Sequence, residues 1–511
     1  MKHPVFPRSV SSRFGFVLSA SMSFVAACML SAQTYTTPAP KPAPAAMCPT
    51  LGWEENLAKY LQPDAAFPTT DTPLDASDCM FHQWSWEAFV WATALDAHGV
   101  PRFMTLHTPA DLLKPDGAPP SAEPPMLTLG TRDIHATGAY IEGTGAIVEA
   151  DGNMLVAPNG YPVYASVHMN EAYFATAKRN LVINGGYLAN GDADFFPVGA
   201  AVFKATWMRL DAGQEPPAGA YVTEARVPVL AVSLTPDNTI YAQPTGRTMT
   251  VKVALLGLHV VGQTVNHPEF LWGTFEHHDN DPRFPDGPNK PPSTASDPRN
   301  YTLYVGGTPF GQTNQPSTQT TATSTSTSTP LSTPSTTITT TTTLTATPRL
   351  TFNPVTQKFS PANNVVLENA TGSETHSPEG PANIANVNQS GHEFLAGRKP
   401  PQSIFAHYDL IGTVWMKPGQ YNLNSNQSNA VGSVNLCNST AETFLQNASG
   451  STTPSTVGNC FSCHNPQTFQ NVAPMPNLPA RRIALSHVLA AGTLYAVPNQ
   501  ISVLVPAGTV K

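Results

Sequence analysis

Two cysteines and a histidine lie close together near the end of the sequence. Cys460 and Cys463 are separated by two residues, and His464 follows directly. Two thiols at this spacing can each form a thioether bond to one vinyl group of a haem, while the adjacent histidine ligates the iron. The pattern predicts one covalently attached haem c, with His464 as the proximal iron ligand.

The same cysteine pair has other interpretations. A CxxC pair can be a redox-active dithiol, or it can supply half of a zinc site. The sequence contains no second CxxC and no downstream HxxxH that would complete a zinc set. No alternation of strands and helices of the thioredoxin kind precedes the pair. Haem attachment is therefore the leading hypothesis, and a structural or redox cysteine pair is the alternative.

A second axial ligand for the iron has several candidates. His487 lies in 481–491, which the sequence predicts as a helix that begins after Pro479 and ends at Gly492. Met475 is the thioether alternative, in a loop flanked by prolines. His259 or His277 could instead reach the iron through the fold, or the sixth position could be open. The sequence alone does not separate these alternatives.

The first 27 residues have the pattern of a signal peptide. Basic residues are followed by an apolar run over 14–25 and then by small residues, as in a cleavable secretory segment. Val25-Ala26-Ala27-Cys28 also resembles a lipobox, in which a lipidated Cys28 would anchor the mature chain to a membrane. Both alternatives predict an exported protein, in the periplasm or held at the outer membrane as a lipoprotein, where haem attachment and disulfides both occur.

The remaining cysteines suggest one disulfide. The chain has six cysteines, of which Cys28 belongs to the signal region and two belong to the haem peptide. Cys48 and Cys79 are the natural pair, closing a loop of about thirty residues and worth about 3 kcal/mol. Cys437 is then left over, and a small buried apolar role fits it better than a reactive thiol.

Composition limits the class of protein. The chain has 511 residues, of which 41% are hydrophobic and 12% charged, so it can bury a sizeable core with more than one structural unit. Its formal charge is −8, and no basic stripe is interleaved with aromatic residues. Binding to nucleic acid depends on such a stripe, because it derives from counterion release. We therefore expect no nucleic-acid partner.

Two stretches of biased composition divide the chain. Residues 28–47 alternate proline and alanine at their end, as in an extended tether. Residues 311–349 are almost all threonine, serine and proline, and such a segment cannot bury enough apolar surface to offset its chain entropy. We expect a disordered insertion there, between a β-rich body at 48–310 and a haem-binding segment at 350–511.

The body is predicted to be mostly antiparallel sheet. Short apolar runs at 161–168, 200–207, 227–232 and 248–261 have strand composition and are separated by turn residues. Apolar side chains from Phe81 to Leu95 recur instead at helical spacing, which predicts an aromatic-rich helix packed on the core. The fold class is therefore α+β: an antiparallel sheet, an N-terminal helix and a C-terminal covalent-haem segment, unlike an ordinary small cytochrome c domain.

A cluster of acidic and imidazole side chains has two interpretations. Oxygen and nitrogen ligands in one short stretch could bind a divalent metal or move protons beside a haem. A polar turn after a strand, closed by Asp281-Pro282, is the simpler explanation. His259, in an apolar run, is more typical of a hydrogen-bonded core histidine. The cluster comprises Glu269, Glu276, His277, His278, Asp279 and Asp281.

An ordered series of motifs resembles a group of uncharacterised bacterial exported proteins with a C-terminal CxxCH. Its GLHI element corresponds to 258–262 and its W-x-x-TFEH-x-DN element to 272–280. The segments 203–207, 408–415 and 438–444 are similar to its VKAAW, YxLIGTxW and NTTMETF. The threonine-rich insertion and Cys437 depart from the pattern. The resemblance implies a c-type cytochrome-like protein and carries no known reaction.

Three functions are compatible with these features. In the first, the protein is an electron-transfer cytochrome, in which a strong sixth ligand gives an iron that changes oxidation state with little rearrangement. In the second, an open distal position makes it a haem enzyme, with a pocket histidine such as His259 or His277 acting as acid and base. In the third, the haem is a structural element of a binding protein. Electron transfer is the leading hypothesis, and the redox partner is not identified by the sequence.

Overall fold

The computed structural model describes fifteen stretches of the chain, and the signal and tether region before residue 48 lies outside them. The described residues are 48, 52–69, 78–112, 126–129, 154–184, 196–234, 240–284, 289–316, 318–324, 342–348, 350–370, 379–417, 430–450, 460–463 and 501–502. The predictions for residues 1–47 therefore remain predictions.

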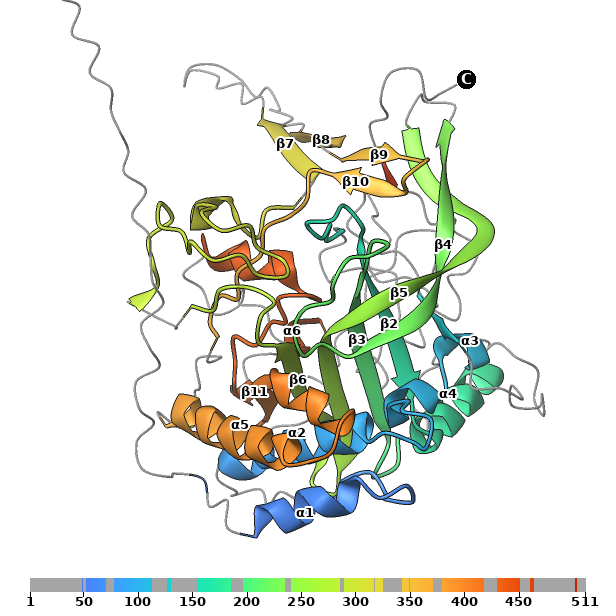
Figure 1. Ribbon diagram of the computed structural model, residues 1–511, viewed down its shortest axis with the longest axis vertical. Helices are drawn as coiled ribbons and strands as arrows, with labels where there is room; N and C mark the ends of the chain where they lie inside the picture. The colour runs from blue at the N-terminus through green and yellow to red at the C-terminus, as the bar shows by residue number, and fades with distance from the viewer. Residues whose placement is uncertain are drawn as a thin grey trace, which may run out of the picture.

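Within these stretches, nine strands form one mixed but mainly antiparallel sheet (Figure 1). Its strands are β1 Leu127–Thr128, β2 Val163–Met169, β3 Ala201–Arg209, β4 Val222–Leu234, β5 Ile240–Thr264, β6 His267–His277, β11 Tyr408–Met416, β12 Ala430–Gly432 and β13 Ile501–Ser502. Strand β5 pairs with β3, β4, β6 and β13, whereas β1 pairs with β4 in the one parallel match among these strands. The predicted α+β class with a mostly antiparallel sheet is confirmed.

The strands sort their side chains to two faces by alternation. On β5, Leu258 and Val260 belong to one apolar cluster, whereas Val261 belongs to a second cluster. Successive side chains of a strand point to opposite sides of a sheet, so the two clusters cover its two faces. The four sequence runs predicted as strands lie in β2, β3, β4 and β5.

Three helices cover one face of the sheet, which we call the helix face (Figure 1). They are α1 Trp53–Tyr60, α2 Asp78–Thr93 and α5 Gly380–Ala396, and α2 contacts α1, α5, β5, β6 and β11. The predicted aromatic helix is confirmed as α2, although it starts three residues earlier than Phe81. Its side chains are packed on the core, and Phe89 stacks on Phe275 of β6 with ring centroids 4.1 Å apart.

Helix α5 owes its existence to packing more than to sequence. It is rich in asparagine, serine and glycine, which are weak helix formers. Trp86 of α2 donates from its indole nitrogen to Asn388 Oδ1 at 2.9 Å, and a Cβ at Gly391 would lie 2.7 Å from the Trp86 ring. The absence of a side chain at Gly391 therefore lets the two helices approach closely.

The predicted disulfide between Cys48 and Cys79 is present. Both cysteines are buried, with 0% and 2% of their surfaces exposed. The bond ties the first described residue to the second residue of α2, so it fixes the start of the helix layer.

The C-terminal segment contributes directly to the sheet of the body. Strand β11 lies between β6 and β12 in the sheet, so residues 408–432 complete the body predicted for 48–310. The packed part of that body also continues beyond Phe310, because Thr313 and Asn314 are 1% and 0% exposed. Long-range strand pairing of this kind leaves no mark in local sequence.

Two small strand pairs form sheets of their own (Figure 1). In the threonine-rich stretch, β7 Thr318–Ser324 pairs with β8 Thr342–Pro348. Residues 325–341 lie outside the described residues, so the disordered insertion predicted for 311–349 stays a prediction. Threonine is β-branched and favours extended backbone, which accounts for the two strands. The second pair is β9 Thr351–Asn353 with β10 Lys358–Ser360.

The remaining elements are short connections and one helix at the edge of the sheet. They are α3 Pro109–Leu112, α4 Glu171–Asn184, α6 Cys460–Cys463 and the 3-10 turns η1 Arg102–Thr105, η3 Phe310–Gln312, η4 Gln402–His407 and η6 Thr443–Gly450.

Candidate functional site

The two cysteines of the CxxCH peptide form a single helical turn, α6. Phe461 within that turn is fully buried and meets Trp272 of β6 edge-on, with ring centroids 6.1 Å apart. Both belong to the apolar cluster opposite the helix face, and Cys460 packs against that cluster. The turn is thus anchored on the second face of the sheet, which we call the far face. His464, Met475 and His487 lie outside the described residues.

Strand register places three parallel rows of residues on the far face. The first row, Val202–Val261–Trp272–Val414, is apolar and includes the tryptophan that Phe461 contacts. The second row is Lys204–His259–Thr274–Gly412, and the third is Thr206–Gly257–Glu276–Asp409. Titratable side chains therefore lie on the same face as the cysteine turn. On β3, β5 and β6 they are two and four residues away from the apolar row.

The segment Asn438–Glu442, which we call the 438–442 loop, lies across the two polar rows. Asn438 donates through its side-chain amide to Thr274 Oγ1 at 2.8 Å, and the hydroxyls of Thr440 and Thr206 are 2.6 Å apart. Asn438, Ser439 and Thr440 are 0–1% exposed. Because each polar side chain has a partner on the sheet, the loop can be buried without losing hydrogen bonds.

Gly257 is required for this close docking. A Cβ built at Gly257 would lie 2.9 Å from Thr440 Oγ1 and 3.0 Å from Asn438 Nδ2. Both distances are too short for an ordinary carbon contact. Gly257, which directly precedes the motif at 258–262, thus makes room for the 438–442 loop.

His259 and Glu442 form an ion pair on the far face. His259 Nε2 and Glu442 Oε1 are 3.3 Å apart, and their side chains are 11% and 19% exposed. This nitrogen makes no aligned hydrogen bond, whereas Glu442 Oε2 accepts one from the backbone N–H of Asn438 at 2.9 Å. Burial favours the neutral acid, but attraction by His259 and Lys204 lowers the pKa of Glu442 to about 2.

Two acidic side chains converge on one serine at the end of the third row. Ser439 Oγ lies 2.6 Å from Glu276 Oε2 and 2.7 Å from Asp281 Oδ2. The backbone N–H of Ser439 also donates to Glu276 Oε1 at 2.7 Å. Burial and the neighbouring Asp281 carboxyl raise the pKa of Glu276 to about 8, and burial raises the pKa of Asp281 as well.

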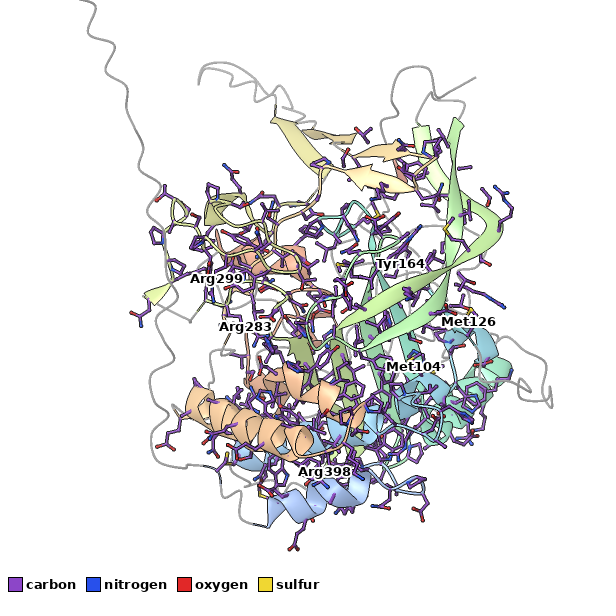
Figure 2. The ribbon with its side chains drawn as sticks, in the orientation of Figure 1. Met104, Met126, Tyr164, Arg283, Arg299 and Arg398 are labelled. Atoms are coloured by element: carbon purple, nitrogen blue, oxygen red, sulfur yellow. A yellow bond between two sulfur atoms is a disulfide. The ribbon has the colours of Figure 1, made fainter. Side chains whose placement is uncertain are left out.

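A separate ion pair lies beside this carboxyl pair. Arg283 Nη1 donates to Asp409 Oδ2 at 2.5 Å, and His392 Nε2 is 3.0 Å from Asp409 Oδ1. Burial alone would raise the pKa of Asp409, but Arg283 and His392 together hold it well below its usual range. In the view of Figure 2, Arg283 lies between helix α5 and Arg299. Its guanidinium is therefore committed mainly to Asp409.

His277 lies in a different group from Glu276, because adjacent residues of a strand point to opposite faces. Its Nε2 lies 3.0 Å from the carbonyl oxygen of Ala218, and its Nδ1 accepts from the N–H of Asp279. With both nitrogens engaged, His277 is not placed to ligate an iron on the far face. Its ring stacks with those of His278 and His407, and burial and the charge of His278 lower its pKa to about 4.

Glu269 also separates from the acidic cluster. It pairs with His267 in the core, where His267 Nδ1 is 2.9 Å from Glu269 Oε1 and both side chains are 1–2% exposed. The stretch from Glu269 to Asp281 thus divides among three places. Within the described part of the chain, no group of three or more histidine, cysteine, aspartate or glutamate side chains is arranged to hold a metal ion.

Sequence reasoning missed the central role of the 438–442 loop. Glu442 and Ser439 entered only as part of a motif, and neither was a candidate site residue. The available signal was an unusually polar run, Asn438-Ser439-Thr440, next to the apolar Leu436 and Cys437. Cys437 is buried at the entrance of the loop, and the Cys48–Cys79 bond excludes it from pairing with either of those cysteines.

The spacing of Cys460 and Cys463 is the spacing that haem attachment needs. Cys460 and Cys463 are the two ends of α6, and the buried Phe461 anchors this turn on the far face. The far face also offers His259, whose buried Nε2 has no aligned hydrogen bond. Cys460 and Cys463 would hold the haem, which would supply one-electron redox chemistry.

Comparisons with known proteins identify no relative of this chain. No family model, no curated protein and no solved structure matches it. Among the helices of the described residues, none combines the length and the apolar composition needed to cross a membrane.

Proposed function

We propose that the protein is an exported c-type cytochrome that transfers electrons through one covalently attached haem. Cys460 and Cys463 provide the two thioether bonds, and His464 provides the proximal ligand. The observation that carries the proposal is the helical turn Cys460–Cys463, whose Phe461 is buried against the far face of a large sheet. The resemblance of the ordered motifs to exported cytochrome-like proteins points the same way.

A broad sheet is a suitable base for electron transfer. An iron that changes oxidation state quickly needs surroundings that rearrange little, and a wall of buried side chains packed as densely as a crystal provides them. The buried Val261, Trp272 and Val414 form such a wall, and the partly buried Val202 continues their row. His487 or Met475 would complete the coordination as sixth ligand, and His259 is the histidine that the far face itself offers.

The export predictions belong to the same proposal. A signal peptide over residues 1–27 would bring the chain to the periplasm, where c-type haem is attached and the Cys48–Cys79 disulfide is stable. A lipidated Cys28 would hold it at the outer membrane, with residues 28–47 as a tether. An external redox protein would exchange electrons with the haem.

An optical spectrum tests the proposal directly. The full chain is produced in a host that attaches haem c, extracted with acid acetone to remove unbound haem, and measured oxidised and reduced. Sharp low-spin α and β bands that survive extraction are expected. Cys463→Ser should lose a thioether and shift the reduced α band, whereas Cys437→Ser, a control outside the haem peptide, should not. A protein without any retained Soret band would refute haem attachment and leave Cys460 and Cys463 as a disulfide or dithiol.

A haem enzyme is the second candidate, and the His259–Glu442 pair favours it. A histidine beside an ionised carboxylate is held in one orientation and can accept or deliver a proton. Both residues lie on the far face with α6. A high-spin spectrum that shifts with cyanide, together with loss of peroxide turnover in His259→Gln, would support the enzyme over the carrier. If removal of the haem unfolds the chain and the intact protein has no redox activity, the haem is instead a structural element.

A further inference from the structure

The contacts of Ser439 require a shared proton. Its Oγ is within 2.7 Å of an oxygen from Glu276 and of an oxygen from Asp281. A hydroxyl carries one proton and can donate it to only one of them. The second short oxygen–oxygen contact needs its own proton, and an ionised carboxylate has none. One of the two carboxyls must therefore be protonated.

The surroundings only partly offset a second negative charge, through the attraction of Arg283. Glu276, Asp281 and Ser439 are 0–1% exposed, so water does not reach them. The nearest cation, Arg283, donates to Asp409 and to the carbonyl oxygen of His277, and it makes no hydrogen bond to either acid. Burying two unpaired carboxylates beside each other would be very costly.

We infer that Glu276, Ser439 and Asp281 form a buried binding site for one proton, which ties the 438–442 loop to both strand β6 and the turn that follows it. Glu276 is the main carrier, because burial and the neighbouring Asp281 carboxyl favour its neutral form and raise its pKa, even though the backbone N–H of Ser439 that it accepts acts in the opposite direction. Once the proton is lost, one of the two contacts of Ser439 Oγ has no hydrogen and must open.

Loss of the proton also affects the His259–Glu442 pair on the far face, because Glu442 belongs to the 438–442 loop. Glu442, which pairs with His259, lies in the same loop three residues after Ser439. The groups facing the site are Arg283 and, beyond it, Asp409 with His392. Arg283 and His392 both pair with Asp409. These three groups therefore do not provide the proton of the second contact to Ser439 Oγ. Proton occupancy at Ser439 thus controls how firmly the partner of His259 is held.

Infrared spectroscopy of the full chain tests the inference without requiring haem. At pH 7 the protein should show the C=O band of a buried, protonated carboxylic acid, which shifts in ²H₂O and responds to ¹³C-labelled glutamate. The band should disappear as the pH rises past about 8, be absent in Glu276→Gln, and persist in Glu54→Gln, a control exposed on α1. In Asp281→Asn the band should disappear at a lower pH, because the neighbouring negative charge is gone.

Hydrogen exchange supplies the second measurement. After correction for intrinsic rates, peptides covering 278–284 or 436–446 should exchange at least tenfold faster at pH 9 than at pH 6.5 in the wild type, but not in Glu276→Gln. Absence of the acid band at pH 7 would overturn the inference, as would its persistence in both Glu276→Gln and Asp281→Asn. Equal exchange at the two pH values would overturn the link to the loop.

Discussion

Replacing Glu276 with glutamine should change how the stability of the protein depends on pH. In the folded wild type, burial and Asp281 raise the pKa of Glu276 to about 8, against its ordinary value of 4.5. Between these two values the folded state keeps a proton that the unfolded state has released. The contribution of this proton to the unfolding free energy is therefore fully present below about pH 4.5, and it is lost as the pH rises through 8.

The size of the effect follows from that difference. At 1.36 kcal/mol for each pKa unit, it corresponds to roughly 5 kcal/mol of unfolding free energy over the whole interval. Glutamine cannot ionise, but its amide can donate to Ser439 Oγ and accept from the backbone N–H, as the protonated acid does. The unfolding free energy of Glu276→Gln minus that of the wild type should therefore increase by about 1.4 kcal/mol per pH unit between pH 5 and 8.

This difference is measured by urea unfolding of both proteins at pH 5, 6, 7, 8 and 9, monitored by near-UV circular dichroism. Titrating groups distant from position 276 contribute equally to the two proteins and cancel, whereas Asp281, which interacts with Glu276, contributes to the difference as well. The exposed Glu54→Gln variant serves as the control and should track the wild type. A difference that stays constant from pH 5 to 8 would show that Glu276 is ionised in the folded protein, and would refute the reasoning from the Ser439 contacts.

Three further variants test the packing that supports the site. Cys48→Ala with Cys79→Ala opens a loop with a sequence separation of 31 residues and should cost roughly 3–4 kcal/mol in chemical unfolding under oxidising conditions. Gly391→Ala places a methyl group 2.7 Å from the Trp86 ring and should lower the unfolding free energy by about 1–3 kcal/mol, with an altered tryptophan emission spectrum. Gly257→Ala inserts a Cβ 2.9 Å from a threonine hydroxyl of the 438–442 loop and should speed hydrogen exchange across 436–446 while leaving exchange in α1 unchanged.

Local patterns predicted the elements whose own residues prefer one conformation. The short apolar runs bounded by turn residues became β2 to β5, and the aromatic stripe after Cys79 became α2. Helix α5 was not predicted, because its asparagines, serine and glycine have low helix propensity. Tertiary packing stabilises it there, through the contact of Gly391 and Asn388 with Trp86 and through its buried apolar side chains.

The sequence by itself determined the CxxCH peptide, the Cys48–Cys79 pairing and the polar stretch that contains Glu276 and Asp281. Tertiary structure decided which of those polar side chains meet. Strand alternation turned His277 away from Glu276, and pairing of β6 with β5 brought Glu276 beside Gly257, where the absence of a side chain admits the 438–442 loop. Ser439 lies 163 residues from Glu276. Contacts over such a distance depend on how the chain packs as a whole, because no local preference in either segment encodes its partner.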